Sequence, residues 1–119
     1  MTETFSLEWN DFHSNLLNSM RNLRHGEHLQ DVTLVGDDQQ QLRANKLVLS
    51  FSSDYFNTVF MNNGQSNVVL CLQGLTKQDL QNCLDYMYYG EVQILQQDLE
   101  RFLNKIPNKR VDQYPRNWQ

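Results

Sequence analysis

The sequence predicts a single domain of the α+β class, on three observations. A hairpin pattern occupies residues 32–44, two helical segments with apolar stripes follow it directly, and a short apolar strand covers residues 68–72. The chain has 119 residues, of which 39% are hydrophobic. This length and composition suit one compact core.

The N-terminal segment combines a strand pattern with a helix pattern. Phe5, Leu7 and Trp9 alternate with polar residues, which predicts a strand with one buried face. Asn10 is expected to cap the helix that follows, and Gly26 is expected to end it. The apolar stripe of this helix contains Phe12, Leu16, Leu17, Met20 and Leu23.

The central segment predicts a hairpin and two short helices. Val32 and Leu34 share one face of the first strand, residues 36–38 make the turn, and residues 40–44 return. Residues 46–51 predict a tightly packed helical turn. Ser52 or Ser53 is then the expected N-cap of a second helix. The apolar positions of that helix are Tyr55, Phe56, Val59 and Phe60.

The C-terminal third predicts two more helices. Thr76 and Asp79 have the spacing of a capping box, and Gly90 stands in the usual position for a helix end. Residues 91–94 predict a short extended segment. Asp98 is the expected cap of a last helix, which Pro107 stops. The buried stripe between the capping box and Gly90 contains Leu80, Cys83, Leu84 and Met87.

Charge and composition restrict the classes of function. Residues 1–104 carry 6 basic and 13 acidic side chains, whereas residues 105–119 carry 4 basic and 1 acidic. The acidic body is a poor surface for phosphate backbones, so we expect it not to bind nucleic acid. Residues 107–119 are expected to form a flexible basic tail, with a nucleic-acid contact or a weak nuclear signal as the alternative. No membrane span or secretion leader is expected.

Cysteine and histidine residues give no sign of a reactive or metal site. Cys71 and Cys83 lie in apolar stretches and are expected to be buried, reduced and inert, as in an intracellular protein. His13, His25 and His28 lack companions at metal-ligand spacing and are expected to be solvated loop residues. Without a phosphate loop or paired carboxylates, we expect no enzyme, no cofactor and no metal.

Two sequence blocks resemble a known family. Asp31-Val32-Thr33-Leu34, Ala44-Asn45-Lys46-Leu47-Val48-Leu49 and Ser53-Asp54-Tyr55-Phe56 with Phe60 are similar to the core of the BTB/POZ domain. Asn45 stands where the family usually has histidine, and asparagine keeps the capacity to donate and accept hydrogen bonds. The opening block, residues 5–12, resembles the tramtrack group of arthropod BTB proteins.

The resemblance implies a cluster of short helices flanked by a small mixed sheet, in a domain of residues 1–106 that forms a strand-swapped dimer. The sequence itself also favours a strand-swapped dimer. The strand at Phe5–Trp9 has no local hairpin partner, and a strand must pair or leave its backbone groups without hydrogen bonds. The alternative is that these aromatics fold back onto their own core. The expected dimer interface contains Phe5, Leu7, Trp9, Phe12, Leu16, Leu17, Met20 and Val92.

The resemblance also implies a charged pocket and larger assemblies. Asp31 and Lys46 match the residues that line the charged pocket of BTB dimers, where co-regulator peptides bind. An ordinary surface pair worth under about 1 kcal/mol is the alternative. Tramtrack-group domains tend to assemble beyond dimers, through the sheet edge near the N-terminal strand.

The function expected on this basis is homo- and hetero-oligomerisation within a nuclear transcription or chromatin regulator. Its partners are a second copy, other BTB proteins and co-regulators, with neither membrane nor direct nucleic-acid binding. The alternative is a substrate adaptor for a cullin-type ubiquitin ligase. Such adaptors carry a hydrophobic-x-Glu motif, and residues 60–65 contain no glutamate.

Overall fold

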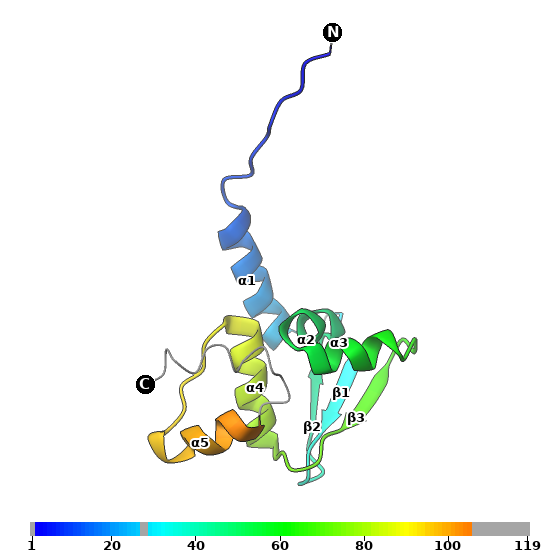
Figure 1. Ribbon diagram of the computed structural model, residues 1–119, viewed down its shortest axis with the longest axis vertical. Coiled ribbons are helices and arrows are strands. Elements are labelled where there is room, and N and C mark those ends of the chain that lie inside the picture. The colour runs from blue at the N-terminus through cyan, green and yellow to red at the C-terminus, as the bar shows by residue number, and fades with distance from the viewer. Residues whose placement is uncertain (1, 27–28, 106–119) are drawn as a thin grey trace.

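The computed structural model describes residues 2–26 and 29–105. Pro107 and the predicted basic tail, as well as His28, lie outside the described residues. Within the described residues, five helices and three strands form an α+β domain, as predicted (Figure 1). In chain order they are α1 (Phe12–His25), β1 (Val32–Val35), β2 (Gln41–Ala44), α2 (Lys46–Ser52), α3 (Asp54–Met61), β3 (Val68–Cys71), α4 (Lys77–Tyr89) and α5 (Gln96–Lys105).

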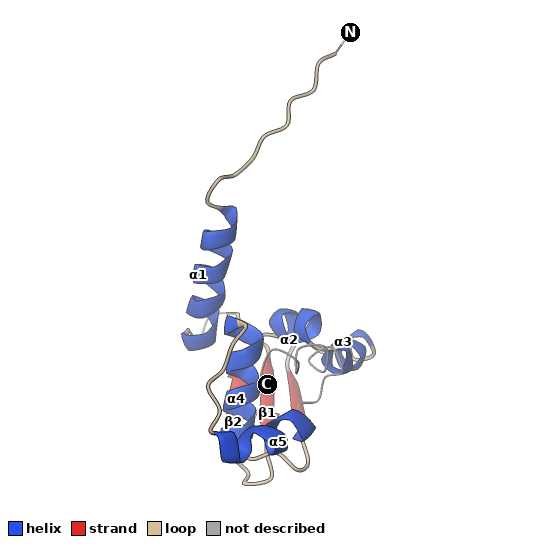
Figure 2. Cartoon of the chain, turned by 60° about the vertical axis from the view of Figure 1, so that its left-hand side comes forward, coloured by secondary structure: helices blue, strands red, loops and turns tan. Residues whose placement is uncertain are grey.

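The sheet is small and mixed, with strand order β2-β1-β3. β1 and β2 form the predicted antiparallel hairpin, in which Leu34 lies opposite Leu42. β1 and β3 run parallel, with Val32 opposite Val68. The connection from β1 to β3 contains β2, α2 and α3, which agrees with the long crossover that a parallel pair requires. Figure 2 shows α4 running alongside the sheet, and α4 contacts both β2 and α2.

The core lies between the sheet and helices α2, α3 and α4. Apolar residues that alternate along β1 and recur at helical spacing in α4 meet there, as the sequence pattern predicts. Leu47 and Phe51 of α2 are exceptions, because both are exposed although the sequence indicated tight packing around this turn. The buried core contains Val32, Leu34, Ala44, Val48, Leu49, Phe56, Val68, Leu72, Leu75, Leu80, Leu84, Met87 and Tyr88.

Helix ends confirm part of the sequence prediction. The Ser53 hydroxyl accepts a hydrogen bond from the Phe56 N–H and caps α3, while Thr76 and Asp79 form the predicted capping box of α4. Gly90 ends α4 in the left-handed region, with φ 80°, which glycine adopts without strain. The Asp79 carboxylate also accepts a hydrogen bond from Arg101 at 2.9 Å, which ties α5 to the start of α4.

Two predicted caps are wrong. The capping position of α1 is Asp11 and not Asn10, and no side-chain cap forms there, because the preceding turn is closed by the backbone bond from Phe12 N–H to the Trp9 carbonyl. Asp98 lies inside the first turn of α5, which begins at Gln96, since the Asp98 N–H donates to the Leu95 carbonyl.

The hairpin turn is fixed against the start of α4. The Asp37 carboxylate accepts from the Gly74 N–H at 2.9 Å, and the Asp38 carboxylate accepts from the Lys77 N–H at 3.0 Å. The Lys77 N–H also holds the pKa of the Asp38 carboxyl below its usual value. A Cβ on Gly36 would lie 2.4 Å from the Leu75 carbonyl oxygen, so this close approach requires glycine.

The two cysteines differ in exposure. Cys83 is buried in α4, as predicted, but Cys71 is exposed, so the prediction of burial was wrong for this residue. A continuous apolar run suggested burial on both faces, whereas Val68 in β3 and Leu72 just after it face the core and Cys71 points to the solvent face.

Thiol reactivity is therefore expected to be limited to Cys71. Burial raises the pKa of the Cys83 thiol to about 12, so the reactive thiolate is scarce at pH 8. Mass spectrometry after brief treatment with iodoacetamide at pH 8 should show one modification, on Cys71. A second modification is expected only in urea, and equal rates in native protein would contradict this.

Candidate functional site

The N-terminal arm, residues 2–10, extends away from the body of the protein (Figure 1). It forms no strand with any described part of this chain, and all of its side chains are exposed. Phe5, Leu7 and Trp9 are 80%, 91% and 62% exposed. The alternation predicted for a strand is present, but the described residues provide no second strand beside it.

The first half of α1 continues this exposed apolar surface. Phe12, Leu16 and Leu17 are all exposed, and the Trp9 ring meets the Phe12 ring edge-on at 5.3 Å between centroids. Contiguous exposed apolar patches of this kind mark sites of interaction with another protein or a membrane. We refer to Phe5, Leu7, Trp9, Phe12, Leu16 and Leu17 as the apolar arm surface.

The second half of α1 is anchored to the body of the protein. Met20 and Leu23 pack against the core, and the Arg24 guanidinium pairs with the Asp85 carboxylate of α4 at 3.2 Å. Met20, which the sequence placed with the interface residues, is thus partly covered by its own chain. The helix holds the apolar arm surface on a fixed support that projects from the domain (Figure 2).

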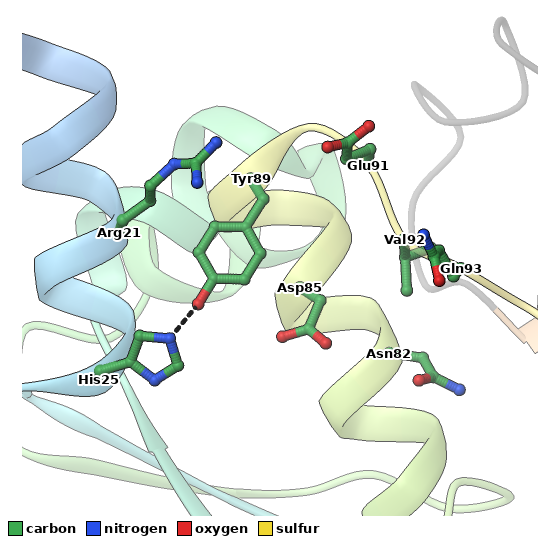
Figure 3. Close-up of a pocket in the computed structure, with 8 residues that line it drawn as sticks. All are labelled: Arg21, His25, Asn82, Asp85, Tyr89, Glu91, Val92 and Gln93. Carbon is green, nitrogen blue, oxygen red and sulfur yellow. Dashed lines mark hydrogen bonds between the residues drawn. The ribbon is translucent and has the colours of Figure 1, made fainter. Parts of the chain in front are cut away.

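A hollow of about 570 Å³ lies where the end of α1 meets the end of α4 and the segment 91–93 (Figure 3). Val92, the remaining predicted interface residue, lines it and is half-buried. The Tyr89 hydroxyl is hydrogen-bonded to His25 Nε2 at 2.7 Å, and the Arg21 guanidinium lies 5.9 Å from the Tyr89 ring centroid. Val92 and Ile94 are more buried than Glu91, Gln93 and Leu95, the alternation of an extended segment.

Asp31 and Lys46 are adjacent but are not joined side chain to side chain. The Asp31 carboxylate accepts from the backbone N–H of Lys46 at 2.8 Å, and the Lys46 ammonium donates to the Gln65 carbonyl. Asp31 thus fixes the start of α2, and Lys46 reaches toward the loop before β3. Neither of the two ion pairs among residues 2–26 and 29–105 includes them.

Except for Val92, sequence reasoning did not single out the residues of the hollow as site residues. His25 was expected to be a solvated loop residue, but it and His13 lie on α1, and His25 contacts Tyr89. Arg21 and Tyr89 were not singled out, because residues this far apart in the chain leave no local pattern when they meet. Among the described residues, no group of three or more histidine, cysteine or acidic side chains is placed to hold a metal. Across the same part of the chain, no helix is long and apolar enough to span a membrane.

Comparison with protein families identifies the fold. A family model described as BTB/POZ domain matches residues 20–109. The chain belongs to the BTB/POZ family. The match includes the hairpin, the paired helices and β3, which are the segments that carried the resemblance in the sequence.

Relatives place this BTB/POZ domain close to the tramtrack group. In Drosophila melanogaster, Protein tramtrack, alpha isoform, is 38% identical over 92% of this chain, which corresponds to 13% of that protein. Protein abrupt is 38% identical over 83% of this chain and 11% of its own length. Longitudinals lacking protein-like is 36% identical, and the match covers 92% of this chain and 85% of that protein.

Solved structures agree on the fold. The BTB domain of human gigaxonin has a TM-score of 0.71 at 20% identity and covers 94% of this chain and 87% of that one. The BTB domain of zebrafish PATZ1 has a TM-score of 0.70 at 19% identity, over 85% of this chain and 82% of that one. BTB domains of the tramtrack group are protein–protein interaction modules that associate with themselves and with other proteins. The chain is therefore an interaction module.

Proposed function

We propose that this BTB/POZ domain is a non-catalytic module for homo- and hetero-oligomerisation in a nuclear transcription or chromatin regulator. The observation that carries the proposal is the apolar arm surface, which no described part of the chain covers. A second copy, other BTB proteins and co-regulators are the proposed partners, and no direct contact with nucleic acid is required. The proposed domain comprises residues 1–106.

The arm provides a physical reason for association. In the swapped arrangement, the arm of one subunit pairs with residues 91–94 of the other, and the first halves of both α1 helices pack together. Pairing satisfies the N–H and C=O groups of the arm and removes its aromatic side chains from water. Both subunits contribute the same surface, so the buried area exceeds about 1,000 Å², the size of a specific interface.

The charged residues suit a second role at the same site. Lys46 begins α2, and Asp31, just before β1, accepts a hydrogen bond from the Lys46 backbone N–H, while the Lys46 ammonium donates to the Gln65 carbonyl. We propose that this pair lines a groove of the dimer and helps to receive co-regulator peptides. The alternative cullin-adaptor function has no favouring observation, since α3 ends at Met61 and residues 60–65 lack the glutamate of the adaptor motif.

Removing two arm side chains is expected to abolish the proposed dimer. Light scattering over a concentration series should give the wild-type chain at least twice its 14.1 kDa monomer mass. The Leu7→Ser/Trp9→Ser variant should lose the arm-mediated dimer and fall well below the wild-type mass, because it removes most of the apolar area of the strand. Both positions are exposed in the single chain, so the variant is expected to fold.

The matched control is Leu29→Ser/Met61→Ser, which removes two side chains of similar exposure outside the arm, 82% and 78%. This variant should keep the wild-type mass. A wild-type chain that stays monomeric, or two double variants that lose mass equally, would contradict the proposal.

A further inference from the structure

β3 forms an open edge of the sheet. The Val68 N–H donates to the Asp31 carbonyl and the Leu72 N–H donates to the Val35 carbonyl, so these residues turn their backbone groups toward β1. Because backbone groups alternate along a strand, Val69 and Cys71 turn theirs away from β1. Within residues 2–26 and 29–105, no strand lies on that side of β3. An edge of this kind is a template for a further strand.

The edge lacks the charged side chains and proline that usually protect against strand addition. Natural edges carry charged side chains, proline or bulges. β2, at the opposite edge, carries Arg43, which donates hydrogen bonds to Thr33 and to the Gln30 carbonyl. In contrast, residues 55–76, which include β3, contain no aspartate, glutamate, lysine, arginine, histidine or proline. This is the longest uncharged stretch in a chain whose net charge is −4.

The side chains beside this edge are apolar or uncharged as well. Val69 is 66% exposed on the solvent face of the sheet, and Cys71 lies next to it on the same face. A hollow of about 530 Å³ adjoins the end of the strand. All residues that line it are uncharged: Tyr55, Cys71, Leu72, Gln73, Gly74, Leu75 and Asn104.

We propose that β3 pairs antiparallel with β3 of a second copy of this chain about a two-fold axis. A second copy is the occupant that fits, because the same uncharged edge occurs on both sides and brings no unpaired charge into the interface. Two copies with net charge −4 also repel each other least where neither carries charge. The register that uses both outward-facing residues places Val69 opposite Cys71 of the other copy, twice, with about four backbone hydrogen bonds.

This contact lies on β3 and includes no residue of the arm. It joins two chains whether or not the arms pair, and together with arm-mediated dimers it builds larger assemblies. A strand of four residues gives only a small contact between two chains. In a larger assembly the contact is strengthened because each arm-mediated dimer carries two such edges.

The register is tested by disulfide trapping in the full chain. Val69→Cys/Cys71→Ser, carrying an affinity tag, is mixed with the untagged wild-type chain and oxidised with glutathione disulfide. In the proposed register the thiol introduced at position 69 faces Cys71 of the wild-type copy. Their Cα atoms are then about 5.5 Å apart, within disulfide range, whereas like positions are beyond ~7 Å. The mixed disulfide should therefore exceed each homodisulfide at least tenfold, against about twofold for random pairing.

Met61→Cys/Cys71→Ser, mixed with wild type in the same way, is the control for collision, because position 61 is 78% exposed but lies off the edge. Cys83 is buried in every chain and does not contribute. The proposal would be overturned if the mixed disulfide exceeded each homodisulfide only about twofold. It would also be overturned if the mixed disulfide formed no faster than in the control.

The same trapping in the Leu7→Ser/Trp9→Ser background separates the two interfaces. The β3 disulfide should persist when the arm is disabled. Loss of the disulfide only in this background would show that the contact depends on the arm and would refute an independent edge. Val69→Lys, on the solvent face, should keep the wild-type melting temperature while reducing the largest assemblies to arm-mediated dimers. Unchanged assembly in Val69→Lys would also refute the proposal.

Discussion

Replacing Phe56 by alanine is expected to lower the free energy of unfolding by about 3–5 kcal/mol. Phe56 is 2% exposed, and its ring stacks on Phe60 at 5.9 Å and meets Tyr55 edge-on at 5.3 Å. Truncation removes apolar area from the core and leaves a cavity that α3 cannot close, because α3 is held at its N-terminus by the Ser53 cap. Urea denaturation, at one fixed chain concentration, measures the loss.

Phe51→Ala is the matched control for this prediction. Phe51 is on the neighbouring helix α2 and is 52% exposed, so its truncation is expected to cost under about 1 kcal/mol. The fixed concentration matters because association with a second copy adds to the apparent stability. Equal losses of unfolding free energy for the two variants would contradict the burial of Phe56 in the core.

Replacing Tyr88 by phenylalanine is expected to cost about 1–3 kcal/mol. The Tyr88 hydroxyl donates to Asn45 Oδ1 at 2.7 Å and accepts from the Asn45 N–H at 2.8 Å. Both residues are buried, so removing the hydroxyl leaves a donor and an acceptor without partners in the interior. Urea denaturation again provides the measurement, with Tyr55→Phe as the control, because Tyr55 is 46% exposed.

The pH dependence of stability gives a second readout for Tyr88. Burial raises the pKa of its hydroxyl from 10.0 to about 12, so the folded state favours the neutral form. This contribution is fully present below pH 10 and is lost as the pH rises toward 12. The loss of stability across this range should be smaller in Tyr88→Phe than in the wild-type chain. Equal alkaline losses would mean that the Tyr88 hydroxyl is hydrated in the folded protein.

Local patterns predicted most of the elements. The β1–β2 hairpin, the Ser53 cap, the capping box at Thr76 and the glycine end of α4 each depend on residues close to one another in the chain. These features can therefore be predicted from the sequence alone. The two cap predictions that failed involve competition between local groups. Asn10 and Asp98 both have suitable capping side chains, but backbone hydrogen bonds fix the helix starts elsewhere.

Long-range contacts account for what the sequence could not supply. An apolar run such as residues 68–72 is compatible with burial on one face or on both, and only the tertiary packing, which buries Val68 and Leu72, leaves Val69 and Cys71 exposed on the opposite face. Asn45 was visible as a departure from the family pattern, but its partner Tyr88 lies 43 positions away. The apolar arm surface was the easiest part of the site to predict, since its alternation is local.

The parallel pairing of β1 and β3 has a consequence for the order of folding. Val32 and Val68 are neighbours in the sheet but lie 36 positions apart in the chain, whereas the β1–β2 hairpin closes a short loop. Loop closure over a longer distance costs more entropy, so the hairpin can form while the third strand is still free. During synthesis the uncharged stretch leaves the ribosome before α4, which shields part of it. The nascent chain therefore passes through a stage in which residues 55–76 are exposed before α4 has formed. Slow elongation at this point would favour binding of this segment by chaperones or by a neighbouring nascent chain.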